Sequence, residues 1–242
     1  PGIRYQPHPA FALDERGQPL YLGKNVAEGR QKIADFPQTG TRELTADDYI
    51  YQMKRLAHPR LHSPIFGMMA DKIVGLKELG EALQNAAKEV PAGDWMDLDA
   101  YPLAGVEKVD SHTWRIRIKG KYPQFIYWLA MPFFAPVPRE VDRFYTQPGM
   151  AAKNLTLDWW PVGTGPFMLS ENDPNRRMVL SRNPNFGGRQ TYPCEGEEGD
   201  RAAGLLDDCG KPLPLVDQAV FTREKEAIPY WNKFLQGYYD AS

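Results

Sequence analysis

The feature that most constrains this 242-residue chain is the stretch 161–186, PVGTGPFMLSENDPNRRMVLSRNPNF. Gly163 and Gly165 flank Thr164, so the backbone is free to adopt a positive φ on either side of one polar residue. Pro166 then fixes the next φ and removes a hydrogen-bond donor. The apolar run FML, the turn DPN and the returning run MVLS follow. The stretch therefore predicts a rigid glycine corner that leads into a β-hairpin.

The glycine corner has a second interpretation, a phosphate cradle. Gly163-x-Gly165 lacks the third glycine of a dinucleotide-binding motif, and no Gly-Lys-Ser/Thr follows it. We therefore expect a structural corner at which alanine in place of either glycine destabilises the fold, by more than ~1 kcal/mol if a positive φ is required there.

The string GTGPF, followed by a strand and by RNPNF, resembles the GTGPY/F and RNP-x-Y/F signature of the family 5 bacterial solute-binding proteins. These are extracytoplasmic oligopeptide- and dipeptide-binding components of ABC importers. Further stretches resemble segments of that family in the same order, and together they cover most of residues 44–240: they lie at 44–51, 55–64, 109–114, 136–139 and 234–240.

The resemblance implies a mixed α/β (α+β) fold of the periplasmic binding protein-like class II, mostly one lobe. Residues 1–242 would then be a fragment of lobe I, without the signal sequence and the second lobe. We expect a helix-rich subdomain over about 44–160 and a strand-rich part over about 161–242 that leads to the second lobe. The order of the expected elements, helices first and strands later, independently favours mixed layers over a uniform parallel sheet.

The resemblance also implies a function, the capture of peptides in a cleft between two lobes and their delivery to ABC permease subunits. It implies a periplasmic, monomeric protein that needs no cofactor. Other ligands of the family are haem, nickel complexes, sugars and opines. The alternative class is a hydrolase or another enzyme, but the chain has no G-x-S-x-G and no H-E-x-x-H motif. We therefore favour a binding protein.

Five residues are our candidates for the ligand cleft. Several family members have a polar segment where this chain has Met131-Pro132-Phe133, so a polar contact does not carry over. Met and Phe suit adaptable apolar contacts, and half-buried packing is the alternative for them. The candidates are Phe66, Met69, Met131, Phe133 and Thr164.

Charge and hydropathy exclude two kinds of partner. The 29 basic and 31 acidic residues nearly cancel, so no overall field draws the chain to nucleic acid. No apolar run approaches the ~20 residues of a membrane span.

Two helices follow from capping and apolar spacing. Thr45 is a good N-cap, and Asp47 and Asp48 occupy the first turn after it. Adjacent helical carboxylates point in different directions, so we interpret the two as capping charges and not as a catalytic pair. A leucine stripe predicts a second helix over 76–89.

Shorter elements are expected later in the chain. Apolar and basic residues alternate over 114–118, which predicts a half-exposed strand. Pro123 suits the first position of a short helix over 124–130. A strand over 216–221 and a helix that ends at Gly237 complete the prediction.

No metal site is predicted. His58 and His62 are four residues apart, but Pro59 lies between them and no third ligand is near. The acidic loop 194–209 lacks the residue order of an EF-hand.

The two cysteines, Cys194 and Cys209, bracket that acidic loop. With no C-x-x-C motif, a disulfide is the simplest account in an oxidising compartment. Closing this loop would stabilise the fold by roughly 3 kcal/mol in the chain-entropy model.

Residues 1–43 are rich in Pro, Gly and polar residues, and we expect mostly loop with a possible strand at 2–5. The segment 13–41 is longer than its counterpart in the resembled family. It is either a surface insertion or a specificity loop, and we favour the surface insertion.

Overall fold

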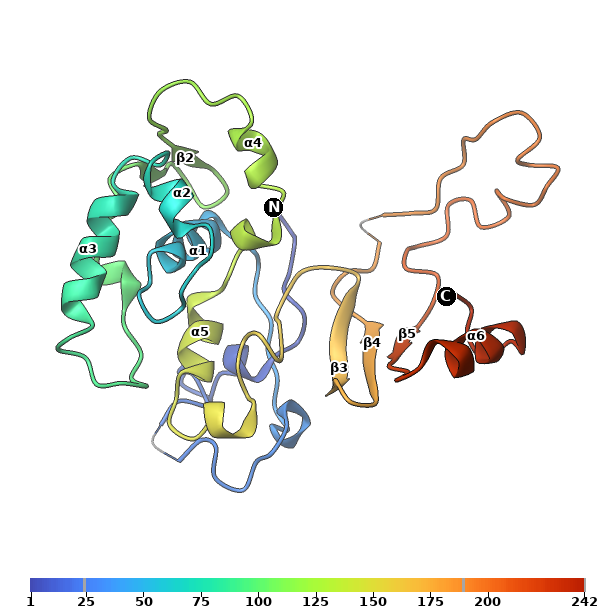
Figure 1. The fold of residues 1–242 in the computed structure, drawn as a ribbon, viewed down its shortest axis with the longest axis horizontal. Helices are drawn as coiled ribbons and strands as arrows, with labels where there is room; N and C mark the ends of the chain where they lie inside the picture. The colour runs from blue at the N-terminus through green and yellow to red at the C-terminus, as the bar shows by residue number, and fades with distance from the viewer. Residues whose placement is uncertain (24, 189, 242) are drawn as a thin grey trace. The chain divides into compact units, whose positions relative to one another are not determined.

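The computed structural model describes residues 1–23, 25–188 and 190–241. The chain divides into two compact units, which we call unit 1 (Pro1–Thr164) and unit 2 (Gly165–Ser242). Helices predominate in unit 1 and strands in unit 2 (Figure 1). The fold is therefore mixed α/β, as predicted.

Helix α1 (Ala46–Leu56) begins where the sequence predicted. Thr45 is extended, and its backbone N–H donates to Asp48 Oδ2 at 3.0 Å, which satisfies one donor that the helix leaves free. Met53 and Leu56 are buried on the inner face. The capping interpretation of Asp48 is confirmed.

Helix α3 (Leu76–Ala86) buries its leucine stripe, as predicted, but ends before Glu89. It starts after Gly75, whose φ of 81° is in the left-handed region. A Cβ at that glycine would lie 2.9 Å from Ala104 Cβ, so the position admits only glycine.

The first core of unit 1 forms around α1 and α3. The two-stranded sheet of β1 (Val106–Lys108) and β2 (Trp114–Ile116) lies against it, and Tyr49 stacks on Trp114 with 5.6 Å between ring centroids. The remaining short helices of unit 1 are η1 (Pro9–Phe11), η2 (Ile33–Asp35), α2 (Phe66–Ala70), η3 (Leu98–Ala100), α4 (Phe125–Trp128), η4 (Pro132–Phe134), α5 (Arg139–Tyr145) and η5 (Ala151–Lys153).

The second core of unit 1 joins residues 1–43 to α5. Tyr21 and Phe36 are buried in it, and Phe36 packs edge-on against Phe144 with 5.2 Å between ring centroids. The surface-insertion interpretation of 13–41 therefore needs correction in part: most of the described residues of this segment are exposed or half-buried, but Tyr21 and Phe36 belong to the core that covers α5. The expected strand at 2–5 is a single bridge between Arg4 and Glu43.

Unit 2 is built on the predicted hairpin. Strands β3 (Phe167–Asp173) and β4 (Arg177–Arg182) pair antiparallel, with a bulge between Leu169 and Glu171. Strand β5 (Gln218–Thr222) adds to β4, two residues later than expected, so the sheet order is β3-β4-β5. Helix α6 (Ala227–Leu235) follows, and Gly237 (φ 79°) comes after it. Figure 1 shows the three strands side by side.

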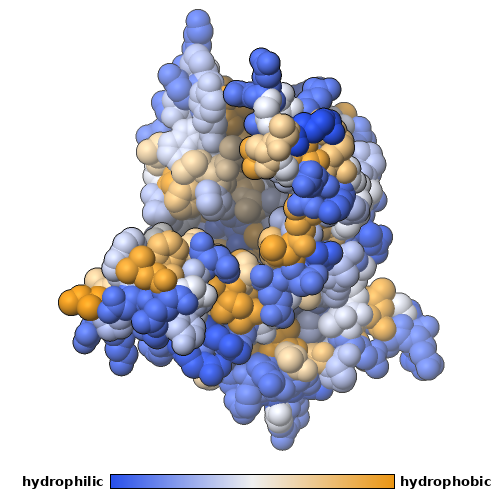
Figure 2. Space-filling model, turned by 90° about the vertical axis from the view of Figure 1, so that its right-hand side faces the viewer, coloured by the Kyte–Doolittle hydropathy of each residue, from blue (hydrophilic) through white to orange (hydrophobic). Residues whose placement is uncertain are grey.

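Few side chains of unit 2 are buried. Val179, Asn183 and Phe186 are its buried residues in the part of the chain that the structure describes. Apolar side chains remain at the surface in the space-filling view (Figure 2). By their exposed fractions, four large apolar residues on or just after α6 lie at the surface of unit 2: Ile228, Trp231, Leu235 and Tyr238.

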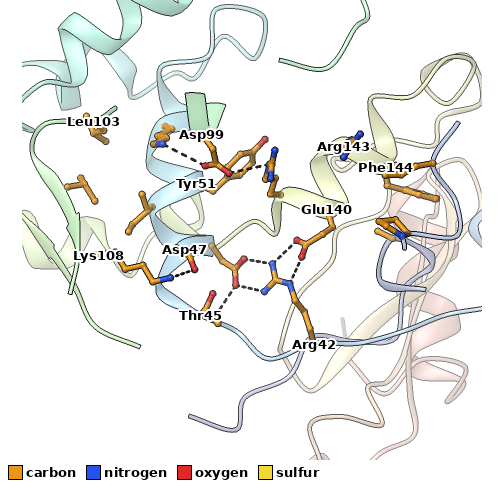
Figure 3. Close-up of a pocket in the computed structure, with 18 of the residues that line it drawn as sticks. Arg42, Thr45, Asp47, Tyr51, Asp99, Leu103, Lys108, Glu140, Arg143 and Phe144 are labelled. Carbon is orange, nitrogen blue, oxygen red and sulfur yellow. Dashed lines mark hydrogen bonds and ion pairs between the residues drawn. The ribbon is translucent and has the colours of Figure 1, made fainter. Parts of the chain in front are cut away.

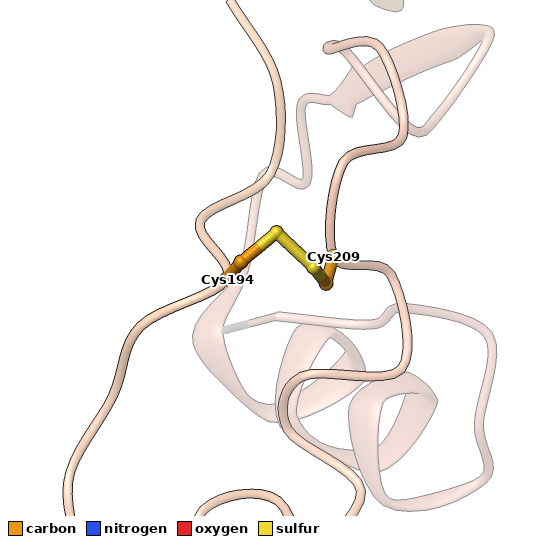
Figure 4. Close-up of a disulfide and its surroundings, with 2 residues drawn as sticks. All are labelled: Cys194 and Cys209. Atoms are coloured by element: carbon orange, nitrogen blue, oxygen red, sulfur yellow. A yellow bond between two sulfur atoms is a disulfide. The ribbon is translucent and has the colours of Figure 1, made fainter.

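Cys194 and Cys209 form a disulfide, which confirms the prediction (Figure 4). Their Cα atoms are 4.6 Å apart, and the bond closes a loop of 15 residues. Around it, the isolated bridge between Thr191 and Pro212 brings the two arms of the loop together. The bond therefore fixes a segment of unit 2 that has no helix or strand of its own.

Candidate functional site

The glycine corner is held by the side chain and backbone of Gln6, a buried residue. Gln6 N–H donates to the Gly163 carbonyl at 2.9 Å, and Gly163 N–H donates to Gln6 Oε1 at 3.1 Å. Gln6 Nε2 donates to the Pro161 carbonyl at 3.4 Å. The N–H and C=O of Gly163 and the carbonyl of Pro161 are thus already paired with Gln6.

The condition under which alanine would be strongly destabilising, a positive φ at the two glycines, is not met. Neither Gly163 nor Gly165 is among the glycines with a left-handed φ in the described residues. A Cβ at Gly165 would meet nothing within 4 Å. The physical reason at Gly163 is backbone pairing with Gln6, which needs an accessible N–H and C=O but not a left-handed turn.

Asn183, the first residue after β4, closes the hairpin of unit 2. It is buried, its Nδ2 donates to the Gly165 carbonyl at 2.8 Å, and its N–H donates to the Pro166 carbonyl at 2.8 Å. The Asn of the RNPNF string therefore ties the end of the hairpin to its start.

A buried chain of polar groups lies in unit 1 before the corner. Ala10 N–H donates to His8 Nδ1 at 3.1 Å, so the neutral ring carries its proton on Nε2 and donates to Tyr145 Oη at 2.9 Å. Tyr145 in turn donates to the Trp160 carbonyl at 2.8 Å. Burial lowers the pKa of His8 to about 3. The ring is therefore neutral and structural.

The five predicted cleft residues differ in their exposure, and none of them lines either of the two pockets described below. Met69 is fully buried in the first core of unit 1, where it offers no surface to a ligand. Phe66 and Phe133 are half-buried and pack against the same core, while Met131 is 44% exposed. Thr164 is the last residue of unit 1 and is half-buried.

A pocket of about 700 Å³ lies in unit 1 (Figure 3). Five separate segments line it, and none of the five predicted cleft residues does so. Its apolar lining consists of Pro9, Ala10, Pro19, Tyr21, Leu22, Ile50, Pro102, Leu103, Val106 and Phe144. Its charged lining consists of Arg42, Asp47, Asp48, Lys54, Asp99, Lys108, Arg139, Glu140 and Arg143.

Arg42 organises one wall of this pocket (Figure 3). Its guanidinium makes paired bonds to Asp48 at 2.6 and 2.9 Å and to Glu140 at 2.7 and 2.7 Å. Asp48 is only 2% exposed. Burial opposes the charge of Arg42, but the two carboxylates raise its pKa above the ordinary value. The same cation holds the pKa of Glu140 below its ordinary value, against the effect of burial.

A second charged group lines the same pocket around Asp99. Lys54, whose side chain is 10% exposed, donates to the Leu98 carbonyl at 3.1 Å and lies 3.7 Å from Asp99. Arg139 shares Asp99 at 3.2 Å and also pairs with Asp97 at 2.6 Å. Two cations therefore compete for the Asp99 carboxylate.

Sequence reasoning missed this pocket. Asp47 and Asp48 were interpreted only as capping charges, yet Asp47 also pairs with Lys108 at 2.6 Å and Asp48 with Arg42. One signal was available in the sequence. A single carboxylate is enough to cap α1, so the second of the two, Asp47 and Asp48, indicated a further role. Their partners come from distant segments, which no local pattern identifies.

The described part of the chain contains neither a metal-binding cluster nor a membrane-spanning helix. Within the described ranges, no group of three or more His, Cys, Asp or Glu side chains is arranged to hold a metal ion. His58 is partly buried, and burial lowers its pKa. Of the helices in the described part of the chain, none is long and apolar enough to cross a bilayer.

Periplasmic binding proteins of other bacteria are similar in sequence to part of this chain. The periplasmic oligopeptide-binding protein OppA of Salmonella typhimurium is 28% identical over 148 residues, which are 59% of this chain and 23% of that protein. The nickel-binding periplasmic protein of Escherichia coli is 30% identical over 98 residues, which are 40% of this chain and 17% of that protein. The chain thus spans about a quarter or less of the length of these relatives.

A solved structure shows the same fold. The substrate-binding domain of an oligopeptide ABC transporter from Bacillus anthracis superposes with a TM-score of 0.53 at 17% identity, over 81% of this chain and 30% of that one. The family profile of the bacterial extracellular solute-binding proteins, family 5 Middle, matches residues 38–197. This is a family of binding proteins and not of enzymes. The chain belongs to family 5 of the bacterial extracellular solute-binding proteins.

Proposed function

We propose that this chain is part of the extracytoplasmic substrate-binding component of an ABC importer, and that this component captures peptides and delivers them to permease subunits. The observation that carries the proposal is the family match over residues 38–197, which includes most of unit 1 and the whole hairpin. The relative OppA, whose name specifies oligopeptides, supports the peptide class.

Exposed apolar side chains of unit 1 fit an adaptable ligand contact. Met131 follows α4, on which Ile126 and Tyr127 are 67% and 72% exposed. A flexible thioether beside two exposed apolar groups accommodates side chains of different shape, while specificity for a peptide backbone comes from hydrogen-bonding groups. We therefore keep Phe66, Met131, Phe133 and Thr164 as proposed cleft residues.

The experiment that tests the ligand class is mass spectrometry of small molecules released by denaturing the intact protein, purified from its own host without refolding. Short peptides are the expected result. A nickel complex in their place would contradict the peptide class and would agree with the nickel-binding relative. Calorimetric titration with di-, tri- and tetra-alanine, with free alanine as control, then gives the preferred length.

Two matched variants of the same intact protein test the cleft residues. Met131→Ser and Met178→Ser remove similarly exposed methionines, at 44% and 40%, from unit 1 and from β4 of unit 2. We expect Met131→Ser to weaken peptide binding by about tenfold, equivalent to ~1.4 kcal/mol, and Met178→Ser to leave it unchanged. Equal affinities of both variants would contradict the assignment of Met131 to the cleft. They would leave the proposal that the ligand is a peptide unaffected.

A further inference from the structure

We propose that the 700 Å³ pocket of unit 1 is a second binding site, which takes a small amphipathic carboxylate. The pocket lies within unit 1 alone, and none of the proposed cleft residues lines it. Its volume is in the range of sites that enclose a small organic molecule, roughly 300–1,000 Å³.

The charge of the lining favours an anion. Among the described residues that line the pocket there are five cations and four carboxylates, and each carboxylate already has a cationic partner. One cation is left over, Arg143, which makes no ion pair with any residue that the structure describes. A ligand with one negative charge would therefore neutralise the pocket.

Arg143 lines the pocket, and its guanidinium is held by a contact with an aromatic ring. It lies on α5 one turn after Arg139, and both guanidinium groups contact the ring of Trp95, at 5.0 Å for Arg139 and 5.2 Å for Arg143. The nearby carboxylate of Asp142 accepts from Arg55, Tyr51 and Trp95 and is thereby committed elsewhere. A planar guanidinium with free N–H groups matches a carboxylate in a paired geometry.

The rest of the lining fits an apolar body and not a second charge. About half of the lining residues are apolar, and Tyr21, Leu22 and Phe144 come from the second-core segments next to Arg143. Leu22 and Arg143 also line a smaller adjoining hollow of about 250 Å³. A doubly charged phosphate would add a charge that no free cation matches, close to Asp99 and Glu140. The occupant we infer is a monocarboxylate with a short apolar chain.

Calorimetric titration of the full chain with octanoate, octanamide and octylamine tests the charge and the apolar body together. These three probes share one chain and differ in the head group. We expect saturable binding of octanoate, at least tenfold weaker binding of octanamide and none of octylamine. Equal binding of octanoate and octanamide, or no saturable binding of octanoate at millimolar concentration, would overturn the proposal.

Variants locate the site. Arg143→Gln is expected to weaken octanoate binding at least tenfold, while Arg16→Gln, which removes an exposed arginine of unit 1 outside the pocket, leaves it unchanged. Leu22→Trp is expected to block binding by filling the hollow. Circular dichroism of each variant checks that it folds. Unchanged octanoate affinity in folded Arg143→Gln and Leu22→Trp variants would place the binding elsewhere and refute the site.

Discussion

Unit 1 and unit 2 are stabilised in different ways. Unit 1 buries two clusters of apolar side chains around α1, α3 and α5. Unit 2 depends on the hydrogen bonds of a three-stranded sheet and on one disulfide, and in the described residues it buries Val179, Asn183 and Phe186. Because burial of apolar surface is the dominant stabilising contribution in folding, the two units should respond to different perturbations.

The largest expected difference comes from removing a buried leucine. Leu83→Ala on α3 deletes a fully buried side chain of unit 1, and we expect a loss of about 3–5 kcal/mol in the free energy of unfolding. Leu205→Ala makes the same change at an exposed position of unit 2, and it should cost less than about 0.5 kcal/mol. Urea unfolding followed by circular dichroism measures both. Similar losses for the two variants would contradict the statement that the two units are stabilised in different ways.

Reducing the disulfide should affect unit 2 alone. The bond between Cys194 and Cys209 closes a loop of 15 residues, for which the chain-entropy model gives about 3 kcal/mol. Amide hydrogen exchange, measured with and without a reductant, should show faster exchange in β4 and unchanged exchange in α3. The Cys194→Ser, Cys209→Ser double variant serves as a control for side effects of the reductant. Faster exchange in α3 would show that the units are not independent.

Acid should weaken unit 1 through His8. Its folded-state pKa of about 3 lies below its ordinary value of 6.5, so the unfolded chain binds the extra proton first. The contribution of His8 is complete above pH 6.5 and is lost as the pH falls toward 3, at up to about 1.4 kcal/mol per pH unit.

His8→Asn tests that contribution, because an asparagine oxygen can still accept from Ala10 N–H but does not titrate. We expect a flatter dependence of stability on pH between 6.5 and 3 in this variant than in the parent, measured by urea unfolding at a series of pH values. Identical slopes would mean that other groups account for acid unfolding. Arg42→Gln is a separate test for Glu140, because the stability that its lowered pKa contributes is complete above the ordinary value of 4.5 and is lost only as the pH falls below it.

The smallest effect is expected at the second glycine of the corner. Gly165→Ala places a Cβ in open space without a left-handed φ. The free energy of unfolding should therefore change by less than about 0.5 kcal/mol, and the melting temperature should change little. Gly40→Ala in unit 1 is the contrast, since its Cβ would lie 2.1 Å from the Phe11 carbonyl oxygen. That clash should cost about 1–3 kcal/mol. A larger loss at Gly165 than at Gly40 would contradict the geometry described for the corner.

Sequence reasoning succeeded where local signals and packing agree. Thr45 with Asp48 marks the start of α1, and the leucine stripe of α3 has the spacing of one helix face. The hairpin was also predictable, since the DPN turn separates two apolar runs that become β3 and β4. In each case the residues that decide the structure are neighbours in the sequence.

Prediction failed where the deciding partner is distant. Residues 13–41 have no periodicity, yet Phe36 is buried because Phe144 lies against it. Gly163 is fixed by hydrogen bonds to Gln6, which lies in a different part of the sequence. The pocket is assembled from five segments, so its unpaired Arg143 could not be distinguished from any surface arginine. Such features depend on which segments meet, and no local pattern encodes that.

The pairing of Gln6 with Gly163 has a consequence for the order of folding. These two residues are 157 positions apart in the sequence, so their contact closes a very long loop. Long-range contacts of this kind slow folding, because the entropy of loop closure is lost before the contact forms. During synthesis at ~5–20 residues per second, the N-terminal segment waits on the order of 10–30 s for its partner. The first residues of unit 1 to be made are therefore among the last to reach their final positions.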